Sequence, residues 1–248
     1  MQLQEFFKQN PRIAVAFSGG VDSSYLLYAA STAGCDVHAY LINSEFQPHF
    51  EINEAISIAK SLDVPLTVKV LSVLSDTNVS NNPSERCYNC KTVILKELWE
   101  LAEADGYTVL CDGTNADDDE SDRPGMKALK EQGVISPLRL AGLGKQEVRQ
   151  LSKQAKLQTH DKPAYACLAT RIPTGTAITQ CLLDKVERAE EALFKMGFSD
   201  FRVRLLPPDT AKIQMPSEQW DRAAANRKEI IKSLKPDFIT VLLDLNGR

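Results

Sequence analysis

Two adjacent glycines join an apolar run to a helical pattern near the start of the chain, in the stretch AFSGGVDSS that covers residues 16–24. The run before them, RIAVAF at 12–17, is short and apolar and predicts a buried strand. Residues 21–32 carry apolar side chains at helical spacing without a proline, which predicts a helix. The chain is therefore expected to pass from strand to helix through a glycine turn, where backbone N–H groups and a helix N-terminus converge.

The residue types in this turn are those of an anion site. Gly19 and Gly20 permit positive φ and let a ligand approach the backbone closely, and Ser18 and Ser23 add hydroxyl donors. Asp22 fits beside an anion only if a divalent cation lies between its carboxylate and a phosphate. A plain tight turn, with Ser or Asp as the N-cap of the helix, is the alternative. The Walker A pattern G-x-x-x-x-G-K-[S/T] does not occur, so a loop of that type is excluded.

Strand and helix patterns alternate through the first two thirds of the chain. Further strand patterns lie at 36–43, 66–73 and 107–115, and further helix patterns lie at 49–63, 91–105 and 145–157. This alternation predicts an α/β fold with a parallel sheet and right-handed crossovers. Ligands bind at the carboxyl ends of such strands, so the glycine turn and the later turn 112–115 (Asp-Gly-Thr-Asn) are expected to face one crevice.

The pattern changes near Thr179. A helix at 180–197, strands at 200–206 and 210–215, a helix at 218–234 and a last strand at 237–245 predict a small α+β module. The segment 170–179, rich in Pro, Gly and Thr, marks the expected boundary. We therefore expect a first domain at 1–176 and a second, for substrate binding or oligomerisation, at 177–248.

Composition narrows the classes of protein. The chain has 248 residues, of which 43% are hydrophobic and 25% are charged, which allows one large or two modest globular domains. A net charge of −4 argues against a large nucleic-acid-binding surface. Neither a membrane-spanning run nor a signal peptide is evident, so a cytoplasmic protein is expected. In that compartment the six cysteines are reduced, and they serve as ligands, nucleophiles or core residues.

The cysteines divide into two groups. Three lie in or beside apolar runs and are expected in the core, namely Cys35, Cys111 and Cys181. The other three lie in polar surroundings: Cys87 and Cys90 form a C-x-x-C pair before a predicted helix, and Cys167 lies in a segment rich in small residues. From spacing alone the pair fits a redox couple, half of a zinc site, part of an iron–sulfur site or unligated thiols. Three cysteines suit a 4Fe–4S cluster with one iron left open.

The string Ser-Gly-Gly-x-Asp-Ser after a strand resembles the pyrophosphate loop of the ATP pyrophosphatase (PP-loop) superfamily, whose domain is adenine nucleotide alpha hydrolase-like. Members usually split ATP between the α- and β-phosphates, release pyrophosphate and leave AMP on a substrate oxygen. The resemblance implies ATP and Mg²⁺ as cofactors, with Asp22 near the metal. The residues expected to bind the nucleotide are Ser18, Gly19, Gly20, Asp22, Ser23, Asn43 and Gly113.

Further motifs follow in order along most of the chain. They are NNPSERCYNCK at 81–91, DGTNADDDESDRPGMKAL at 112–129, SPLRLAGLGKQEVRQLSKQAKL at 136–157, DKPAYACLATRIPTGTAIT at 161–179 and KVERAEEALFKMGFSDFRVR at 185–204. Together with the glycine loop they resemble the LarE family of ATP-dependent sulfur transferases. This resemblance implies that ATP activates a carboxylate of pyridinium-3,5-dicarboxylate mononucleotide, which becomes a thiocarboxylate during synthesis of the nickel-pincer nucleotide.

Two sulfur sources are known in that family. The resemblance to its three-cysteine members implies that Cys87, Cys90 and Cys167 are the catalytic residues and hold a 4Fe–4S cluster that carries sulfide. The alternative is that Cys167 gives up its own sulfur and becomes dehydroalanine. Four basic residues are candidates for substrate binding: Lys162, Arg171, Arg202 and Arg204. The sequence departs from the family pattern after Arg204, where Leu205 and Leu206 stand in place of an expected histidine.

Lesser candidates and other functions stay open. The acidic run 117–120 is either a solvated loop or contributes a metal ligand. Arg123 and Pro124 either belong to the site or only fix the loop, and Arg86 either binds substrate phosphate or is an exposed surface residue. A tRNA thiolase shares the loop and often three cysteines, but it would need a surface for RNA that the acidic balance disfavours. An ammonia-using amide ligase would not need the cysteines, and an iron–sulfur or zinc sensor would only bind nucleotide. We expect a homo-oligomer with a small-molecule substrate and neither nucleic acid nor membrane as partner.

Overall fold

The computed structural model describes residues 2–118 and 124–247. Its backbone contacts divide the chain into two compact units. Unit 1 comprises Met1–Val73 and Glu85–Lys162, and unit 2 comprises Leu74–Ser84 and Pro163–Arg248. The assignment of 1–176 and 177–248 as functional domains stays a prediction.

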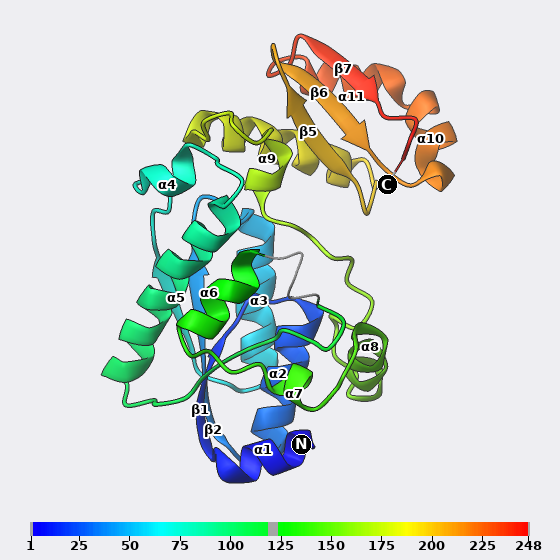
Figure 1. Cartoon of the computed structure of the whole chain (residues 1–248). Coiled ribbons are helices and arrows are strands. Elements are labelled where there is room, and N and C mark those ends of the chain that lie inside the picture. The colour runs from blue at the N-terminus through cyan, green and yellow to red at the C-terminus, as the bar shows by residue number, and fades with distance from the viewer. Residues whose placement is uncertain (1, 119–123, 248) are drawn as a thin grey trace. The chain divides into compact units, whose positions relative to one another are not determined.

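Unit 1 is built on a four-stranded sheet, which confirms the predicted α/β class (Figure 1). The order is β3-β2-β1-β4, and each pair of neighbours is parallel. The strands are β1 (Arg12–Ala16), β2 (Asp36–Asn43), β3 (Leu66–Val70) and β4 (Leu110–Asp112). Because the strands are parallel, the glycine loop after β1 and the turn after β4 lie at the same edge of the sheet.

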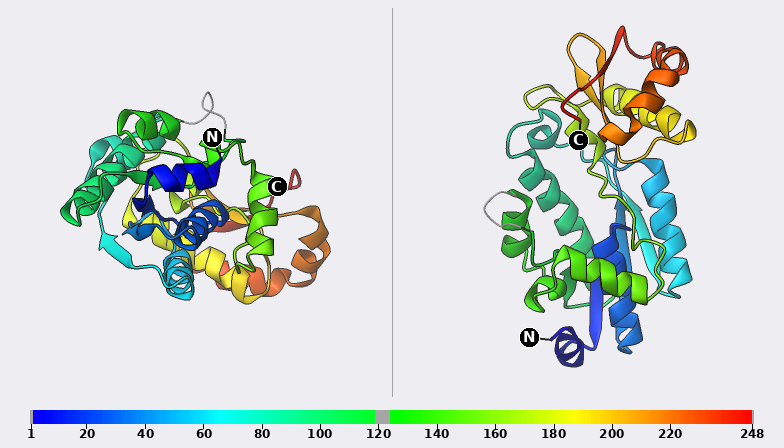
Figure 2. Two further views of the ribbon diagram at one scale, coloured as in Figure 1. Left: turned by 90° about the horizontal axis from the view of Figure 1, so that it is seen from below. Right: turned by 90° about the vertical axis from the view of Figure 1, so that its right-hand side faces the viewer.

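Helices cover both faces of this sheet (Figures 1 and 2). Side chains alternate along β1, so Ile13 and Val15 point to one face and Ala14 points to the other. The first face packs against α1 (Leu3–Gln9), α2 (Val21–Thr32), α3 (His49–Ser61), α7 (Pro137–Leu140) and α8 (Lys145–Gln154). The second face packs against α5 (Arg86–Ala104) and α6 (Pro124–Glu131). Burial on both faces explains why these strands read as apolar runs.

Unit 2 contains a three-stranded mixed sheet in the order β5-β6-β7. β5 (Arg202–Leu206) is antiparallel to β6 (Thr210–Gln214), and β6 is parallel to β7 (Thr240–Leu243). Its helices are α4 (Thr77–Ser80), α9 (Gln180–Lys195), α10 (Trp220–Ala225) and α11 (Arg227–Leu234), with short 3-10 turns η1 (Leu168–Arg171) and η2 (Ser217–Gln219). One face of the sheet packs Val203 and Ile213 against α9 and α11, as the predicted α+β module requires.

Several predicted elements differ in detail. The C-x-x-C pair lies inside α5 and not before it, because the helix begins at Arg86. The predicted helix at 218–234 is two helices that meet at Asn226. Cys111 is buried as predicted, but Cys181 is exposed on the first turn of α9, so its core assignment was wrong. Within 2–118 and 124–247, no helix combines the length and apolarity that a membrane crossing requires.

Candidate active site

The glycine loop follows β1 directly and packs against α3. Gly19 has φ of +70°, and a Cβ built on it would lie 2.7 Å from the Cβ of Ala55. Any other residue at position 19 would therefore be strained in its backbone and would clash with the helix. The sequence requires glycine here because of this close approach.

The loop presents an open helix N-terminus. Gly20 is the N-cap of α2 in an extended conformation, and no side chain caps the helix. The alternative of a turn capped by Ser or Asp is therefore wrong. The Ser18 and Ser23 hydroxyl oxygens lie 3.0 Å apart, and the Gly20 N–H points to Ser18 Oγ at 3.4 Å. Hydroxyl groups and the first N–H groups of a twelve-residue helix thus gather at one spot, as an anion requires.

Asp22 lies in the first turn of α2 with one carboxylate oxygen satisfied. Its Oδ2 accepts a hydrogen bond from Asn115 Nδ2 at 3.2 Å, whereas its buried Oδ1 has no partner in the described parts of the chain. Burial raises the pKa of Asp22, because the ionised carboxylate loses hydration. A Mg²⁺ ion fits this orphaned oxygen. Within 2–118 and 124–247, no group of three His, Cys, Asp or Glu residues able to hold a metal ion occurs.

The turn after β4 lies against the glycine loop, as the sheet topology predicts. A Cβ on Gly113 would lie 2.6 Å from the backbone nitrogen of Ser23, so only glycine fits between the two turns. Asp112 accepts hydrogen bonds from Ser136 Oγ at 2.6 Å and from the Thr114 N–H at 3.3 Å, which fixes the turn. Asn43, the last residue of β2, lies at the same edge of the sheet.

The two described residues of the acidic run after this turn, Asp117 and Asp118, accept hydrogen bonds from backbone N–H groups. Asp117 Oδ2 accepts from the N–H of Lys145 at 2.7 Å, at the start of α8, and Asp118 Oδ2 accepts from the N–H of Asn115 at 3.0 Å. Asp119, Glu120 and Arg123 lie outside the described residues. The hydrogen bonds of Asp117 and Asp118 therefore shape the loop beside Asp22.

Lys162 is the last residue of unit 1 and contacts the glycine loop. Its Nζ lies 3.3 Å from the carbonyl oxygen of Gly19, 3.3 Å from Glu51 Oε1 and 2.8 Å from Glu54 Oε2. Both glutamates belong to α3. The sequence indicated Lys162 but not its partners, because an acidic residue on a helix otherwise reads as part of a solvated face.

The C-x-x-C pair occupies the start of α5. Cys87 and Cys90 are three residues apart on this helix, a spacing that puts both thiols on one side of one turn. Cys87 is exposed and Cys90 is partly exposed. Arg86 Nη2 donates to Cys87 Sγ at 3.6 Å. Both thiols are therefore close to each other and reach the surface of the helix.

Cys167 is the residue directly before η1 in unit 2, and a buried ion pair stabilises the segment around it. Arg171 Nε lies 2.9 Å from Glu190 Oε1, and the two side chains are 0% and 2% exposed. Burial alone would lower the pKa of Arg171, but the hydrogen bond and charge of Glu190, together with Tyr165 and Cys167, outweigh burial and the pKa is raised. The guanidinium also donates to the carbonyl of Ala166 at 2.7 Å. The predicted substrate residue Arg171 is thus placed in the interior, where it holds the backbone around Cys167.

Glu190 is a site residue that sequence reasoning missed. It accepts from the backbone N–H of Val203 at 2.8 Å and from the hydroxyl of Tyr165, in addition to Arg171. A signal was present, since Glu190 occupies the apolar stripe of α9. The other members of that stripe are the buried residues Leu183, Val186, Ala189 and Leu193. A charged residue within such a stripe requires a buried partner.

Arg202 and Arg204 lie on one face of β5, as their alternation predicts. Arg204 Nη1 donates to the carbonyl of Thr170 at 2.8 Å, and its Nε donates to Gln214. Both arginines are partly buried. Unit 2 therefore brings Arg204 to the segment that follows Cys167, while Lys162, Cys87 and Cys90 belong to unit 1.

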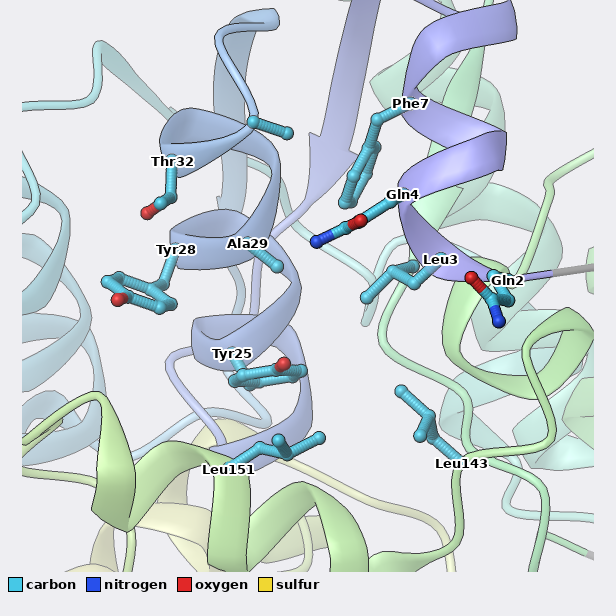
Figure 3. A pocket seen from close by; sticks show the side chains of 11 residues that line it. Gln2, Leu3, Gln4, Phe7, Tyr25, Tyr28, Ala29, Thr32, Leu143 and Leu151 are labelled. Carbon is cyan, nitrogen blue, oxygen red and sulfur yellow. The ribbon is translucent and has the colours of Figure 1, made fainter.

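A separate pocket of about 340 Å³ lies beside α2 (Figure 3). Tyr25 and Tyr28 of α2, Phe7 of α1, Leu143 and Leu151 contribute to its wall. None of the residues that line it belongs to the predicted nucleotide set.

The parallel sheet, the glycine loop at the end of β1 and the open N-terminus of α2 are the features of a PP-loop-type domain. No protein-family model matches the chain. The chain is similar over nearly its whole length to three known proteins. Two are uncharacterised: one from Synechocystis sp. (35% identity, 99% of this chain and 92% of the relative) and one from Methanocaldococcus jannaschii (33% identity, 94% and 88%).

The third relative is the pyridinium-3,5-bisthiocarboxylic acid mononucleotide synthase of Lactiplantibacillus plantarum. It is 33% identical, over 97% of this chain and 88% of the relative. The chain belongs to the LarE family of ATP-dependent sulfur transferases.

Proposed function

We propose that this chain uses ATP to adenylate a carboxylate of pyridinium-3,5-dicarboxylate mononucleotide and converts it to a thiocarboxylate, in nickel-pincer nucleotide synthesis. The observation that carries the proposal is the identity of 33% over 97% of the chain to the synthase of Lactiplantibacillus plantarum. The glycine loop supports it, because the loop joins an open helix N-terminus to an acidic side chain with an orphaned oxygen.

Adenylation solves a chemical problem of the substrate. A carboxylate is a poor acyl donor, since its leaving group would be oxide. The carboxylate oxygen attacks the α-phosphorus of ATP, the bond to the β-phosphate bridging oxygen breaks, and pyrophosphate leaves. The proposed role of Ser18, Gly20 and Ser23 is to hold that pyrophosphate as its charge develops. Asp22 would hold Mg²⁺, which supplies positive charge to the leaving phosphates.

The sulfur source is the second part of the proposal. Three thiolates from Cys87, Cys90 and Cys167 would hold a 4Fe–4S cluster, which supplies a sulfide on the iron that has no protein ligand. In the alternative, the Cys167 thiolate attacks the acyl carbon, a C–S bond forms and AMP leaves. Loss of the Cys167 α-proton to a base then breaks its Cβ–S bond, which releases the thiocarboxylate and leaves dehydroalanine.

Turnover with the dicarboxylate mononucleotide and MgATP tests the reaction. We expect AMP, pyrophosphate and a thiocarboxylate, which mass spectrometry identifies. A protein prepared without oxygen that makes neither AMP nor thiocarboxylate would refute the proposed function. Iron content and the protein mass after turnover then separate the two sulfur sources. About four irons per chain and an unchanged mass support the cluster, whereas absence of iron and loss of the mass of H₂S support Cys167.

A further inference from the structure

The Lys162 ammonium group lies close to three oxygen atoms of unit 1. Its side chain is 15% exposed, and Nζ lies 2.8 Å from Glu54, 3.3 Å from Glu51 and 3.3 Å from the Gly19 carbonyl oxygen. An ammonium group has three donors, and three acceptors lie within 3.3 Å of its nitrogen. Two carboxylates already compensate its single charge. The residue is therefore placed to organise the loop and not to supply a free cation to a phosphate.

The contact with Gly19 fixes the direction of one peptide group. In a trans peptide the carbonyl and the following N–H point in opposite directions. Because the Gly19 carbonyl points to Lys162, the Gly20 N–H points the other way, to Ser18 Oγ at 3.4 Å. A peptide between two glycines meets little steric resistance to rotation by half a turn. The bond from Lys162 opposes that rotation.

The same part of α3 supports both the loop and the lysine. Gly19 packs on Ala55, with only 2.7 Å between a built Cβ and the alanine Cβ, and Glu54 immediately precedes Ala55. Glu51 lies one turn earlier on this helix. Packing on Ala55 sets the position of Gly19, and the lysine held by the two glutamates sets the orientation of its carbonyl.

We propose that Lys162 is a positioning residue of the glycine loop, which orients the Gly19–Gly20 peptide so that the Gly20 N–H donates to pyrophosphate. This inference rests on the proposed use of ATP and goes beyond it by assigning the lysine to the loop and not to the substrate. Glu51 and Glu54 contribute to the same positioning role, because they hold the Lys162 ammonium group in place.

Titration calorimetry with magnesium pyrophosphate and, separately, with AMP tests the proposal without any carboxylate substrate. Lys162→Met is expected to weaken pyrophosphate binding about tenfold, the loss of one charged hydrogen bond, and to leave AMP binding unchanged. The double variant Glu51→Gln with Glu54→Gln is expected to weaken pyrophosphate binding severalfold as well. The control Lys60→Met also removes a positive charge, but from an exposed position of α3, and is expected to leave the binding of both pyrophosphate and AMP unchanged.

The double variant separates two roles of Lys162, positioning of the loop and direct contact with phosphate, because the two roles predict opposite changes in pyrophosphate affinity. If Lys162 contacted phosphate directly, removal of the competing carboxylates would strengthen pyrophosphate binding, and that result would overturn the proposal. Equal losses for AMP and pyrophosphate in Lys162→Met would also overturn it, because they indicate general damage to the site. A wild-type protein that binds pyrophosphate but makes no thiocarboxylate would refute the proposed function alone, and the titrations would still decide the role of Lys162.

Discussion

Replacement of Glu190 by glutamine is expected to lower the free energy of unfolding of unit 2 by about 3–5 kcal/mol. Glutamine has nearly the shape of glutamate and keeps one carbonyl oxygen, so the substitution chiefly removes charge. Arg171 keeps its charge in the variant, because a guanidinium does not lose its proton in proteins. With both side chains at least 98% buried, the variant leaves a positive charge in the interior without its partner.

Urea unfolding followed by circular dichroism measures this loss. The matched control is Glu191→Gln on the same helix, since Glu191 pairs with Lys195 at 3.5 Å while their side chains are 45% and 78% exposed. The control is expected to cost less than about 0.5 kcal/mol. A double replacement of Arg171 by Met and Glu190 by Leu is expected to recover much of the loss, because it removes both charges. If Glu190→Gln costs no more than the control, the argument from burial is refuted.

Two further substitutions test the glycine loop. Asp22→Asn is expected to abolish the Mg²⁺ dependence of ATP binding and to raise stability at pH 7. The direction of this effect follows from the raised pKa of Asp22. The folded state binds the Asp22 proton more tightly than the unfolded state, so the contribution of Asp22 to the free energy of unfolding falls as the pH rises from below 3.8 through the pKa of the folded state. Urea unfolding should therefore show that the variant gains more free energy of unfolding over the wild type at pH 7 than at pH 4. An equal gain at the two pH values would contradict the prediction. Gly113→Ala places a Cβ 2.6 Å from the Ser23 nitrogen, so we expect ATP affinity to fall at least tenfold, while unchanged affinity by calorimetry would show that the two turns can separate freely.

The sequence predicted the parallel sheet well because burial on both faces leaves apolar runs with clear ends. The bounds of β2 and the start of α2 match the predicted ranges. The predicted ends of elements were less accurate where the local sequence pattern differs from the structure that the whole fold imposes. The start of α5 reads as loop because Cys87 and Asn89 are weak helix formers, yet the helix begins at Arg86.

Residue type alone singled out two glycines of the candidate site, and their role in nucleotide binding stays a prediction. Gly19 and Gly113 were assigned to nucleotide binding, and the structure adds that each faces a neighbour too close for a side chain. The partners of charged residues were beyond prediction, since Lys162 meets two glutamates more than 100 positions earlier in the chain. Arg171 had no visible sequence signal for burial until its partner Glu190 was placed.

Unit 2 is not a contiguous piece of the sequence. Asn82, from the stretch Leu74–Ser84, is fully buried and donates to the carbonyls of Pro173 and Thr176. The N–H of Ile178 donates to the carbonyl of Ser80 at 2.7 Å. A fragment that starts at Pro163 would lack these partners, and such buried groups are costly when left without hydrogen bonds.

The same interleaving orders events on the ribosome. When the stretch that contains Asn82 leaves the exit tunnel, the backbone that it binds has not been synthesised. The hydrogen bonds of that stretch can be completed only after residue 178 has emerged, by which time Glu85–Lys162 has also been synthesised. The two stretches of unit 2 thus come from either side of Glu85–Lys162 in the sequence, and unit 2 is completed last. Exchange of this unit between relatives would need two grafts made together.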